Sequence, residues 1–585
     1  MDSPVPSTPA AADSSLGWLR RLARLAQPNQ LFFILAILIG VLAGLAVVVF
    51  RWSIALVQRH VLGVPGQNPL RTILAPALTG LFIGLLVVRF FPRARGSGVN
   101  QTKAALYIYD GYIAFRTVVG KFITAALAIG SGQSLGPEDP SLQVGAGLAS
   151  FLGRRLNLSR SRQRLVAPLG AAAGLAAAFN APIAAVLFVI EEVIGRWNSG
   201  VVGAVVLAAV SSTVVARAFF GDHPLFQAPP FELRHPYELL AYAVLGVVGG
   251  FASLLFVKLV AWLRPRLLAL PRWTQYVQPA TAGLIIGIVG LWFPQIMGAG
   301  YDAVNQAMGG AYLWPTLALL CLLKIGATAL SFTSGTPGGM FAPTLFIGAM
   351  MGGAVGGVEH LFLHRLAAPV GVYALVGMGT AFAGILRAPM TSVFMVVEVS
   401  GSYDIVLPLL ISNSLAYFIS RRWQPLPIFD LLTLQDGLVL PSMEERREEQ
   451  VLHVEDAMRS AAQAARAIPV IAAERPVREA WSRAQVAPRK FVLIDGGQGA
   501  WYGVTLDKLA PLVVRAQEDR PLREVLDEEW RLPVLYPDQP LEAFLREAGD
   551  EPLLPVIHRA HGLLLGVMTL PDALAAYHRG EVDQE

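Results

Sequence analysis

The chain contains very little cysteine and little charge. Its 585 residues include one cysteine, Cys321, and only 15% of them are charged. A single thiol cannot close a disulfide within the chain, so no disulfide framework supports the fold. Soluble globular proteins carry about 25% charged residues, whereas this chain combines its low charge with 54% hydrophobic residues. The composition therefore excludes an ordinary soluble protein for most of its length.

Basic residues gather just before the first hydrophobic run. Arg20, Arg21 and Arg24 follow a segment rich in Ser, Pro and Ala that has no pattern of a cleavable signal. By the positive-inside rule we expect this end in the cytoplasm. The net charge of +5 says little about partners, because arginines at membrane edges explain it. We expect no nucleic-acid partner and no metal.

Long hydrophobic runs are what the sequence has in abundance. Residues 31–50 form an uncharged run long enough to cross a bilayer, and residues 73–88 and 239–257 come close. The segments after Thr281, Trp314 and Phe341 look shorter or are interrupted by Gly and Pro. Such interruptions are tolerated at membrane depth only where protein or water satisfies the backbone. We therefore predict an integral membrane protein built as a bundle of broken helices.

Two segments far apart in the chain read almost alike. Residues 180–192 and 387–399 share Ala-Pro, two valines and one glutamate, so that Glu191 matches Glu398. Glu192 instead matches Val399. A repeat of hydrophobic segments indicates two related halves with a substrate site where they meet. An acid at the end of an apolar helix is costly in lipid, which makes Glu192 a functional candidate.

Four segments place Gly or Pro ahead of an apolar helix. They are residues 96–100, 136–140, 339–343 and 427–430. A helix that starts inside the protein offers unpaired N–H groups and a positive dipole end, which suit an anion. Singly, each segment also fits a common loop, a helix kink or an acid placed for the helix dipole. Together they predict an anion site without a full positive charge.

The C-terminal part has a different composition. From residue 444 the chain is charged, and then α/β-like. We expect strands at 468–471, 490–494, 532–535, 554–557 and 563–568, and helices at 477–484 and 540–548. This pattern resembles a tandem CBS domain, in which Thr569 and Asp572 correspond to residues that can hold the ribose of an adenine nucleotide. A dimerisation module without ligand fits the same pattern at least as well.

The membrane segments, taken in order, resemble the CLC family of chloride channels and chloride/proton antiporters over roughly residues 30–435. The segment containing Ser97 and Gly98 corresponds to the family's Gly-Ser-Gly-Ile-Pro element, whose serine hydroxyl binds chloride. The resemblance also implies that the amides of Met340 and Phe341 face the ion. Phe429 falls where the family has a tyrosine ligand.

The resemblance further assigns roles to the acids. Residues 136–140 match Gly-Lys/Arg-Glu-Gly-Pro, which makes Glu138 the external gating glutamate. Glu192 falls on the internal proton-transfer glutamate, and Lys121 on a buried lysine. Glu191 and Glu398 match acids that the family keeps for structure.

Four residues depart from the family pattern. Pro137 replaces a basic residue, Asp139 a glycine, Asn100 a proline and Phe429 the tyrosine. A lost hydrogen bond to a charged group is worth about 1.5–3 kcal/mol, so Phe429 predicts weaker anion binding. We expect Asp139 to lie close to solvent beside Glu138, where it disfavours the charged form of Glu138.

These observations predict an all-α polytopic membrane protein with an inverted repeat, followed by a soluble α/β CBS pair. Its function is expected to be chloride/proton antiport, and its partners are chloride, protons and the lipid bilayer. We expect a homodimer in the inner membrane, with both termini in the cytoplasm. A passive voltage- or pH-gated chloride channel is the alternative, if Glu192 caps a helix or pairs with a cation. A fluoride exporter is disfavoured because Ser97 and Pro140 follow the chloride pattern. An intramembrane serine hydrolase is disfavoured because it needs a histidine base on a core helix, and the histidines of this chain lie near loops or ends. We expect no enzyme. The expected divisions are residues 1–30 (N-terminal segment), 31–435 (membrane domain), 436–452 (linker) and 453–585 (tandem CBS domain).

Overall fold

The computed structural model divides the chain into two compact units, Met1–Arg447 and Glu448–Glu585. Arg20, Arg21, Arg24 and most of the expected linker lie outside the described residues. The residues described below are 28–195, 199–226, 237–362, 368–437, 452–464, 468–497, 499–537, 539–549, 551–558 and 562–582.

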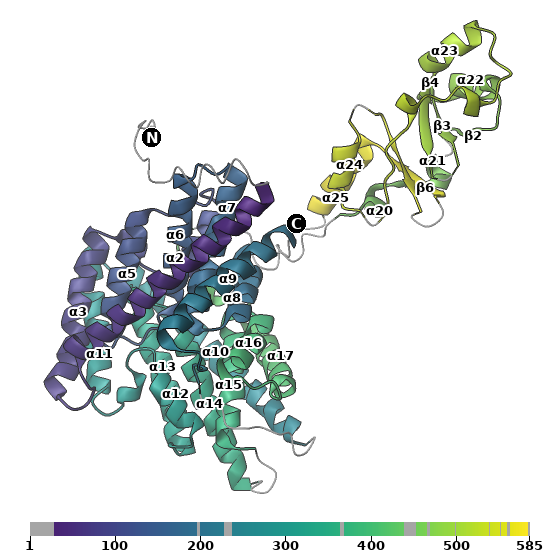
Figure 1. The fold of residues 1–585 in the computed structure, drawn as a ribbon. Coiled ribbons are helices and arrows are strands. Elements are labelled where there is room, and N and C mark those ends of the chain that lie inside the picture. The colour runs from purple at the N-terminus through teal and green to yellow at the C-terminus, as the bar shows by residue number, and fades with distance from the viewer. Residues whose placement is uncertain are drawn as a thin grey trace, which may run out of the picture. The chain divides into compact units, whose positions relative to one another are not determined.

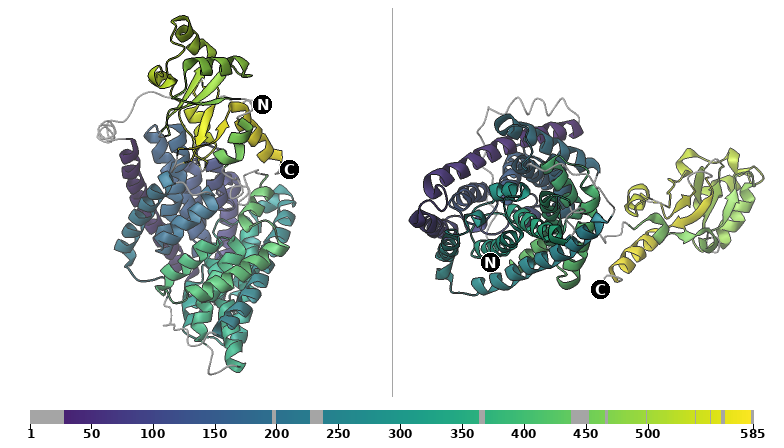
Figure 2. Two further views of the ribbon diagram at one scale, coloured as in Figure 1. Left: turned by 90° about the vertical axis from the view of Figure 1, so that its right-hand side faces the viewer. Right: turned by 90° about the horizontal axis from the view of Figure 1, so that it is seen from below.

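The first unit is helical throughout its described part (Figure 1). Helix α2 lies across α7 and α9, and the left view of Figure 2 separates the helices of the first half (purple and blue) from those of the second (teal and green). The helices are α2 (Pro28–Val57), α3 (Pro69–Arg89), α4 (Gly98–Tyr107), α5 (Phe115–Gly130), α6 (Glu138–Arg155), α7 (Arg160–Phe179), α8 (Pro182–Phe188), α9 (Ser199–Phe220), α10 (Glu238–Leu268), α11 (Gln278–Val289), α12 (Tyr301–Met308), α13 (Trp314–Thr333), α14 (Phe341–Phe362), α15 (Val370–Leu386), α16 (Pro389–Ser400), α17 (Val406–Trp423) and α18 (Ile428–Gln435).

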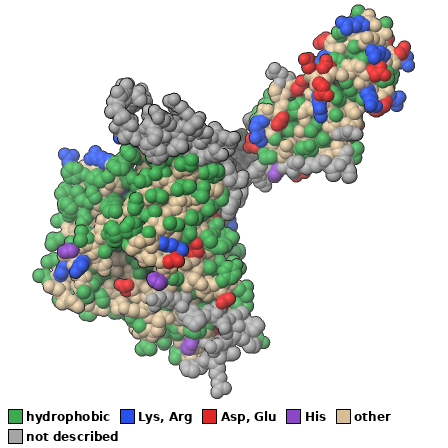
Figure 3. All heavy atoms as spheres, viewed as in Figure 1, with side chains coloured by type: hydrophobic (Ala, Val, Ile, Leu, Met, Phe, Trp, Pro, Cys, Tyr) green, Lys and Arg blue, Asp and Glu red, His purple; other side chains and the backbone are tan. Residues whose placement is uncertain are grey.

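Six helices of the described residues are long and apolar enough to cross a membrane. They include α2, α3 and α10, where we expected spans, and also α13 and α14, which we expected to be short or interrupted. That expectation was wrong because Pro343 falls in the first turn of α14, where a missing N–H breaks no hydrogen bond. The glycines of α14 do not interrupt it either, because they pack against α15 and α13. Figure 3 shows hydrophobic side chains covering much of the visible face of this unit.

The two halves repeat the same packing. Helix α6 crosses α7 where Gly145 meets Gly170, and α14 crosses α15 where Gly348 meets Gly377. A methyl group at any of these four glycines would collide with the backbone of the partner helix. Close approach of this kind at small residues is typical of helix pairs in membranes, and it brings the starts of α6 and α14 into the interior.

The two glutamates common to both repeats each cap the start of a helix in the other half. The Glu398 carboxylate of α16 accepts hydrogen bonds from the Ile183 and Ala184 amides at the start of α8, at 3.0 and 2.7 Å. The Glu191 carboxylate accepts from the Thr391 amide at the start of α16, at 2.9 Å. Each acid neutralises unpaired N–H groups of the opposite half, so both have a structural role.

The second unit contains two small three-stranded sheets, ordered β2-β3-β4 and β1-β6-β5. In the first, β2 pairs parallel with β3, and β3 antiparallel with β4; in the second both pairs are antiparallel. Its elements are α20 (Val454–Ala457), β1 (Arg459–Ser460), α21 (Ala461–Ala464), β2 (Val470–Ala472), α22 (Val477–Val486), β3 (Phe491–Asp495), β4 (Trp501–Thr505), α23 (Leu506–Val514), α24 (Glu542–Glu547), β5 (Leu554–Ile557), β6 (Leu564–Met568) and α25 (Leu570–Val582).

One expected strand of this unit is absent. Residues 532–535 form no strand, and only Leu535 makes a parallel bridge, to Val556 of β5. The apolar side chains Leu532 and Leu535 are buried all the same. The sequence pattern predicted burial correctly. A strand, however, also needs a neighbouring strand along its length, and this segment makes only one bridge.

Candidate functional site

The starts of α6 and α14 meet inside the first unit. Gly136 and Gly339, just before these helices, exchange two backbone hydrogen bonds of 2.8 Å. All four helix starts expected from the Gly and Pro segments are present, at Gly98, Glu138, Phe341 and Ile428. The positive ends of α6 and α14 therefore converge in a buried region, which favours negative charge there.

Glu138 lies at this meeting point and is fully buried. Its carboxylate accepts a hydrogen bond from the Ala342 amide of α14, at 3.3 Å, and another from the Tyr301 hydroxyl of α12. Tyr301 was not among the site residues expected from the sequence. The Glu138 carboxylate therefore takes donors of α14 and α12 at the place where the starts of α6 and α14 meet.

Asp139 is also fully buried, which corrects the expectation that it lies close to solvent. Its carboxylate accepts a hydrogen bond from the Ser97 hydroxyl, at 2.9 Å, and one from the Gly98 amide. The start of α6 packs against the start of α4, so the side chain that follows Glu138 points at a second helix start. The two adjacent acids bind at different helix ends.

Ser97 caps α4, because its hydroxyl oxygen accepts from the Val99 amide at 3.1 Å. Buried Lys121 supports this loop from α5 by donating to the carbonyls of Gly96 and Ala94, at 2.5 and 3.2 Å. Within the described residues no hydrogen bond joins a histidine to Ser97, whose hydroxyl instead donates to Asp139.

The second half also contains a loop that is held by a buried lysine, and this repeat was not expected from the sequence. Buried Lys324 of α13 donates to the carbonyls of Ile296 and Gly298, at 2.9 and 2.7 Å. The signal was available, because Phe-Pro followed by Gly-x-Gly occurs at residues 91–98 and again at 293–300. Ser97 of the first copy corresponds to Ala299 of the second.

A cluster of phenylalanine rings forms an apolar wall of the site. The Phe429 ring lies 6.1 Å from that of Phe341 and 6.3 Å from that of Phe188, between ring centroids. The Asn100 side chain donates to the Phe429 carbonyl at 3.1 Å. Phe341, Phe429 and the neighbouring Met340 are all buried. The phenylalanine ring offers no donor, so this wall is apolar.

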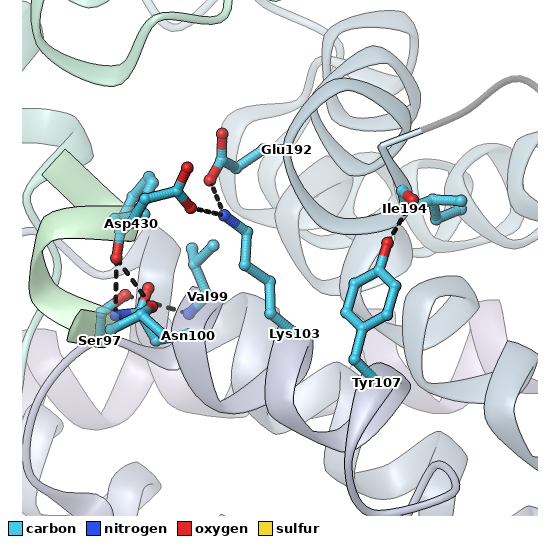
Figure 4. A network of polar contacts seen from close by, with 10 residues as sticks. Ser97, Val99, Asn100, Lys103, Tyr107, Glu192, Ile194 and Asp430 are labelled. Atoms are coloured by element: carbon cyan, nitrogen blue, oxygen red, sulfur yellow. Dashed lines mark hydrogen bonds and ion pairs between the residues drawn. The ribbon is translucent and has the colours of Figure 1, made fainter. Parts of the chain in front are cut away.

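Glu192 lies in a second polar cluster (Figure 4), on the π-helix Val189–Ile194 that continues α8. Its carboxylate pairs with the Lys103 ammonium of α4, which also lies 3.0 Å from the Asp430 carboxylate of α18. The corresponding segment of the second half is a regular α-helix, and π-helical turns often mark functional sites. Lys103 was not among the residues expected from the sequence, because its helix also carries Asn100, Gln101 and Thr102 and only the fold buries it.

A cavity of about 290 Å³ reaches Ser97 and Asn100. Arg93, Arg95 and Arg264 contribute to its lining, together with Asp436, which pairs with Arg264 at 2.5 Å. Among the described residues there is no group of three side chains that could hold a metal.

The expected nucleotide residues of the second unit bind each other. The Thr569 hydroxyl donates to the Asp572 carboxylate at 2.6 Å, and Arg459 pairs with the same carboxylate. A ribose would have to displace these partners.

Comparisons with known proteins agree on one family. Residues 79–421 match the family described as voltage gated chloride channel. The chain is 35% identical over 396 residues to a putative chloride channel protein ClcB-like of Ralstonia nicotianae, covering 65% of this chain and 91% of that protein. It is 33% identical over 359 residues to the H(+)/Cl(-) exchange transporter ClcA of Vibrio campbellii, covering 60% and 76%.

Solved structures give the same picture. A slow cyanobacterial Cl-/H+ antiporter is 26% identical with a TM-score of 0.65, covering 70% of this chain and 98% of that one. A eukaryotic CLC transporter, at 21% identity and a TM-score of 0.61 over 92% and 97% of the two chains, shares the fold. The expected polytopic fold of the membrane unit is thereby confirmed.

Proposed function

Because the chain belongs to the voltage gated chloride channel family, we propose that it exchanges chloride for protons across a membrane. The observation that carries this proposal is the placement of Glu138. Its carboxylate is bound by the Ala342 amide and the Tyr301 hydroxyl at the converging starts of α6 and α14. A side chain held this way occupies a place that suits a chloride ion equally well.

The exchange follows from this competition. Ionised Glu138 occupies the anion place, and protonation removes the charge that binds it there. The side chain then leaves, and chloride takes the exposed donors. Each cycle of Glu138 thus replaces a carboxylate by chloride and carries one proton, which couples the two ions.

The remaining parts of the pathway are assigned to residues around this point. Ser97, Gly98 and the amides of Met340 and Phe341 would bind chloride farther along, with Phe429 as an apolar wall. Glu192 would pass protons to and from the cytoplasmic side. Lys103 and Asp430 surround Glu192 and give it a polar, charge-compensated position in an otherwise apolar region.

One experiment tests the proposal. The purified full chain is reconstituted into liposomes, and chloride efflux and proton uptake are recorded together under an outward chloride gradient. Exchange predicts proton uptake against its own gradient, abolished by a protonophore. Chloride efflux without proton movement would contradict exchange.

A passive chloride channel is the second candidate. The observation favouring it is the ion pair between Lys103 and Glu192, since a glutamate committed to a cation carries no proton. The same two-flux recording separates the candidates.

For the C-terminal unit we propose a tandem CBS module that faces the cytoplasm together with the N-terminus, in an inner-membrane homodimer. Two successive sheets, each flanked by short helices, support this assignment. A role in dimerisation fits better than nucleotide binding, because Asp572 is already bonded to Thr569 and Arg459. Thermal shift with ATP or AMP tests the nucleotide, and a shift would support it.

A further inference from the structure

We propose that the Asp139 carboxylate is a second tethered anion of the pathway, which occupies the chloride-binding hydroxyl of Ser97 and so lowers the affinity for chloride. The proposal rests on the proposed transport function, in which Ser97 binds chloride. Asp139 would thereby be a further residue of the site that selects and releases chloride.

The hydrogen bonds of Ser97 make the two anions mutually exclusive. Its hydroxyl oxygen accepts from the Val99 amide, and its single hydrogen is donated to Asp139. A serine hydroxyl has one hydrogen, so Ser97 cannot donate to chloride while Asp139 holds it. The Gly98 amide is taken by the same carboxylate.

The space around Asp139 is shaped for this position. A Cβ at Gly98 would lie 2.6 Å from the Asp139 carboxylate, and a Cβ at Gly339 would lie 2.7 Å from the Asp139 Cβ. Only glycine on both sides leaves room for the side chain between the starts of α4 and α14. The carboxylate is therefore enclosed, not held loosely at a surface.

The surrounding charges divide between the two acids. Lys121, whose ammonium is fixed by the Gly96 and Ala94 carbonyls, interacts electrostatically with Asp139. Lys324 and Arg51 interact with Glu138 instead. Lys121 thus offers one compensating charge beside Ser97, and an ionised Asp139 already uses it. A chloride ion arriving there meets like charge and no free hydroxyl.

A plain capping role does not account for this arrangement. Ser97 already caps α4 through the Val99 amide. Asp139 takes instead the hydroxyl hydrogen and the first amide of the helix, which are the groups an incoming anion would use. When Asp139 leaves or is neutral, both donors become free.

The test is a double-mutant cycle on chloride binding, measured by calorimetry with the purified full chain at constant ionic strength. Asp139→Gly should bind chloride at least about tenfold more tightly than the natural chain. Ser97→Ala should change binding less than about twofold in the natural chain but weaken it at least about fivefold in the Asp139→Gly background. Equal effects of Ser97→Ala in both backgrounds, or no gain from Asp139→Gly, would overturn the proposal.

Asp139→Asn covers the case in which the glycine variant does not fold. Asn keeps an acceptor for the Gly98 amide but removes the charge, so chloride binding should tighten by a smaller factor. Bromide in crystals gives an independent readout, with an anomalous peak at Ser97 expected in the Asp139 variants and not in the natural chain. A peak of equal height in both contradicts the inference. Absence of proton coupling in the two-flux recording would instead refute exchange and leave this cycle unaffected.

Discussion

Lys103 and Glu192 form a buried ion pair between α4 and the π-helix that follows α8. Lys103 also reaches Asp430, the residue after Phe429, so one ammonium joins three segments. Removing one member of a buried pair costs about 3–5 kcal/mol, because the remaining charge is left uncompensated. A substitution at Lys103 or Glu192 therefore changes the stability of the protein as well as the proton transfer proposed for Glu192.

The first prediction concerns Glu192→Gln. The variant should abolish proton uptake and leave chloride flux measurable, because an amide cannot accept the proton. The two-flux recording measures both. Glu191→Gln, on the neighbouring residue, is the control and should retain proton coupling. Unchanged proton uptake in Glu192→Gln would remove this residue from the mechanism.

The second prediction uses the ion pair itself. Lys103→Met should lower the free energy of unfolding by about 3–5 kcal/mol, because Glu192 and Asp430 lose their shared cation. Adding Glu192→Gln should recover part of this loss, since one buried carboxylate disappears. Thermal unfolding in detergent compares the single and double variants. A double variant less stable than the single one would show that the pair is not the source of the effect.

The third prediction concerns the Tyr301 hydroxyl, which donates to the Glu138 carboxylate. Tyr301→Phe removes a hydrogen bond to a charged group, worth about 1.5–3 kcal/mol. Glu138 should then leave its place more readily, so chloride turnover should rise and its pH dependence should change. Tyr312→Phe, which removes a hydroxyl bonded to Gln306 at an exposed position, is the matched control. Identical turnover in the two variants would speak against this role of Tyr301.

The fourth prediction concerns Phe429. Phe429→Tyr adds a donor to the apolar wall and should tighten chloride binding severalfold or more in calorimetry. Phe188→Tyr places a hydroxyl on the neighbouring ring of the same cluster and should have less effect. If both variants bind like the natural chain, the position of Phe429 relative to the ion is not the one proposed.

The fifth prediction separates structure from coupling. Glu398→Gln weakens the capping of the Ile183 and Ala184 amides and should lower stability by about 1–3 kcal/mol. Proton coupling should persist in the fraction that folds, because Glu398 carries no proton in the cycle. Loss of coupling in well-folded protein would contradict the structural assignment.

Local patterns in the sequence determined much of the architecture. Hydrophobic runs located the first spans, and the Gly and Pro segments located the four helix starts, because these features depend on nearby residues and on lipid. The repeat of residues 180–192 and 387–399 distinguished Glu191 and Glu398, which cap both halves, from Glu192, which has no counterpart. In contrast, residues 532–535 showed that an apolar pattern reports burial and not a strand.

Only the tertiary structure decided which polar groups meet. Ser97 and Asp139 are 42 residues apart, Lys103 and Glu192 are 89 apart, and Tyr301 and Glu138 are 163 apart. The sequence gives the type of each side chain but not its direction, which depends on how the start of α6 packs against α4, α12 and α14. Because of that packing, Asp139 is a buried partner of Ser97, whereas the sequence led us to expect it close to solvent beside Glu138.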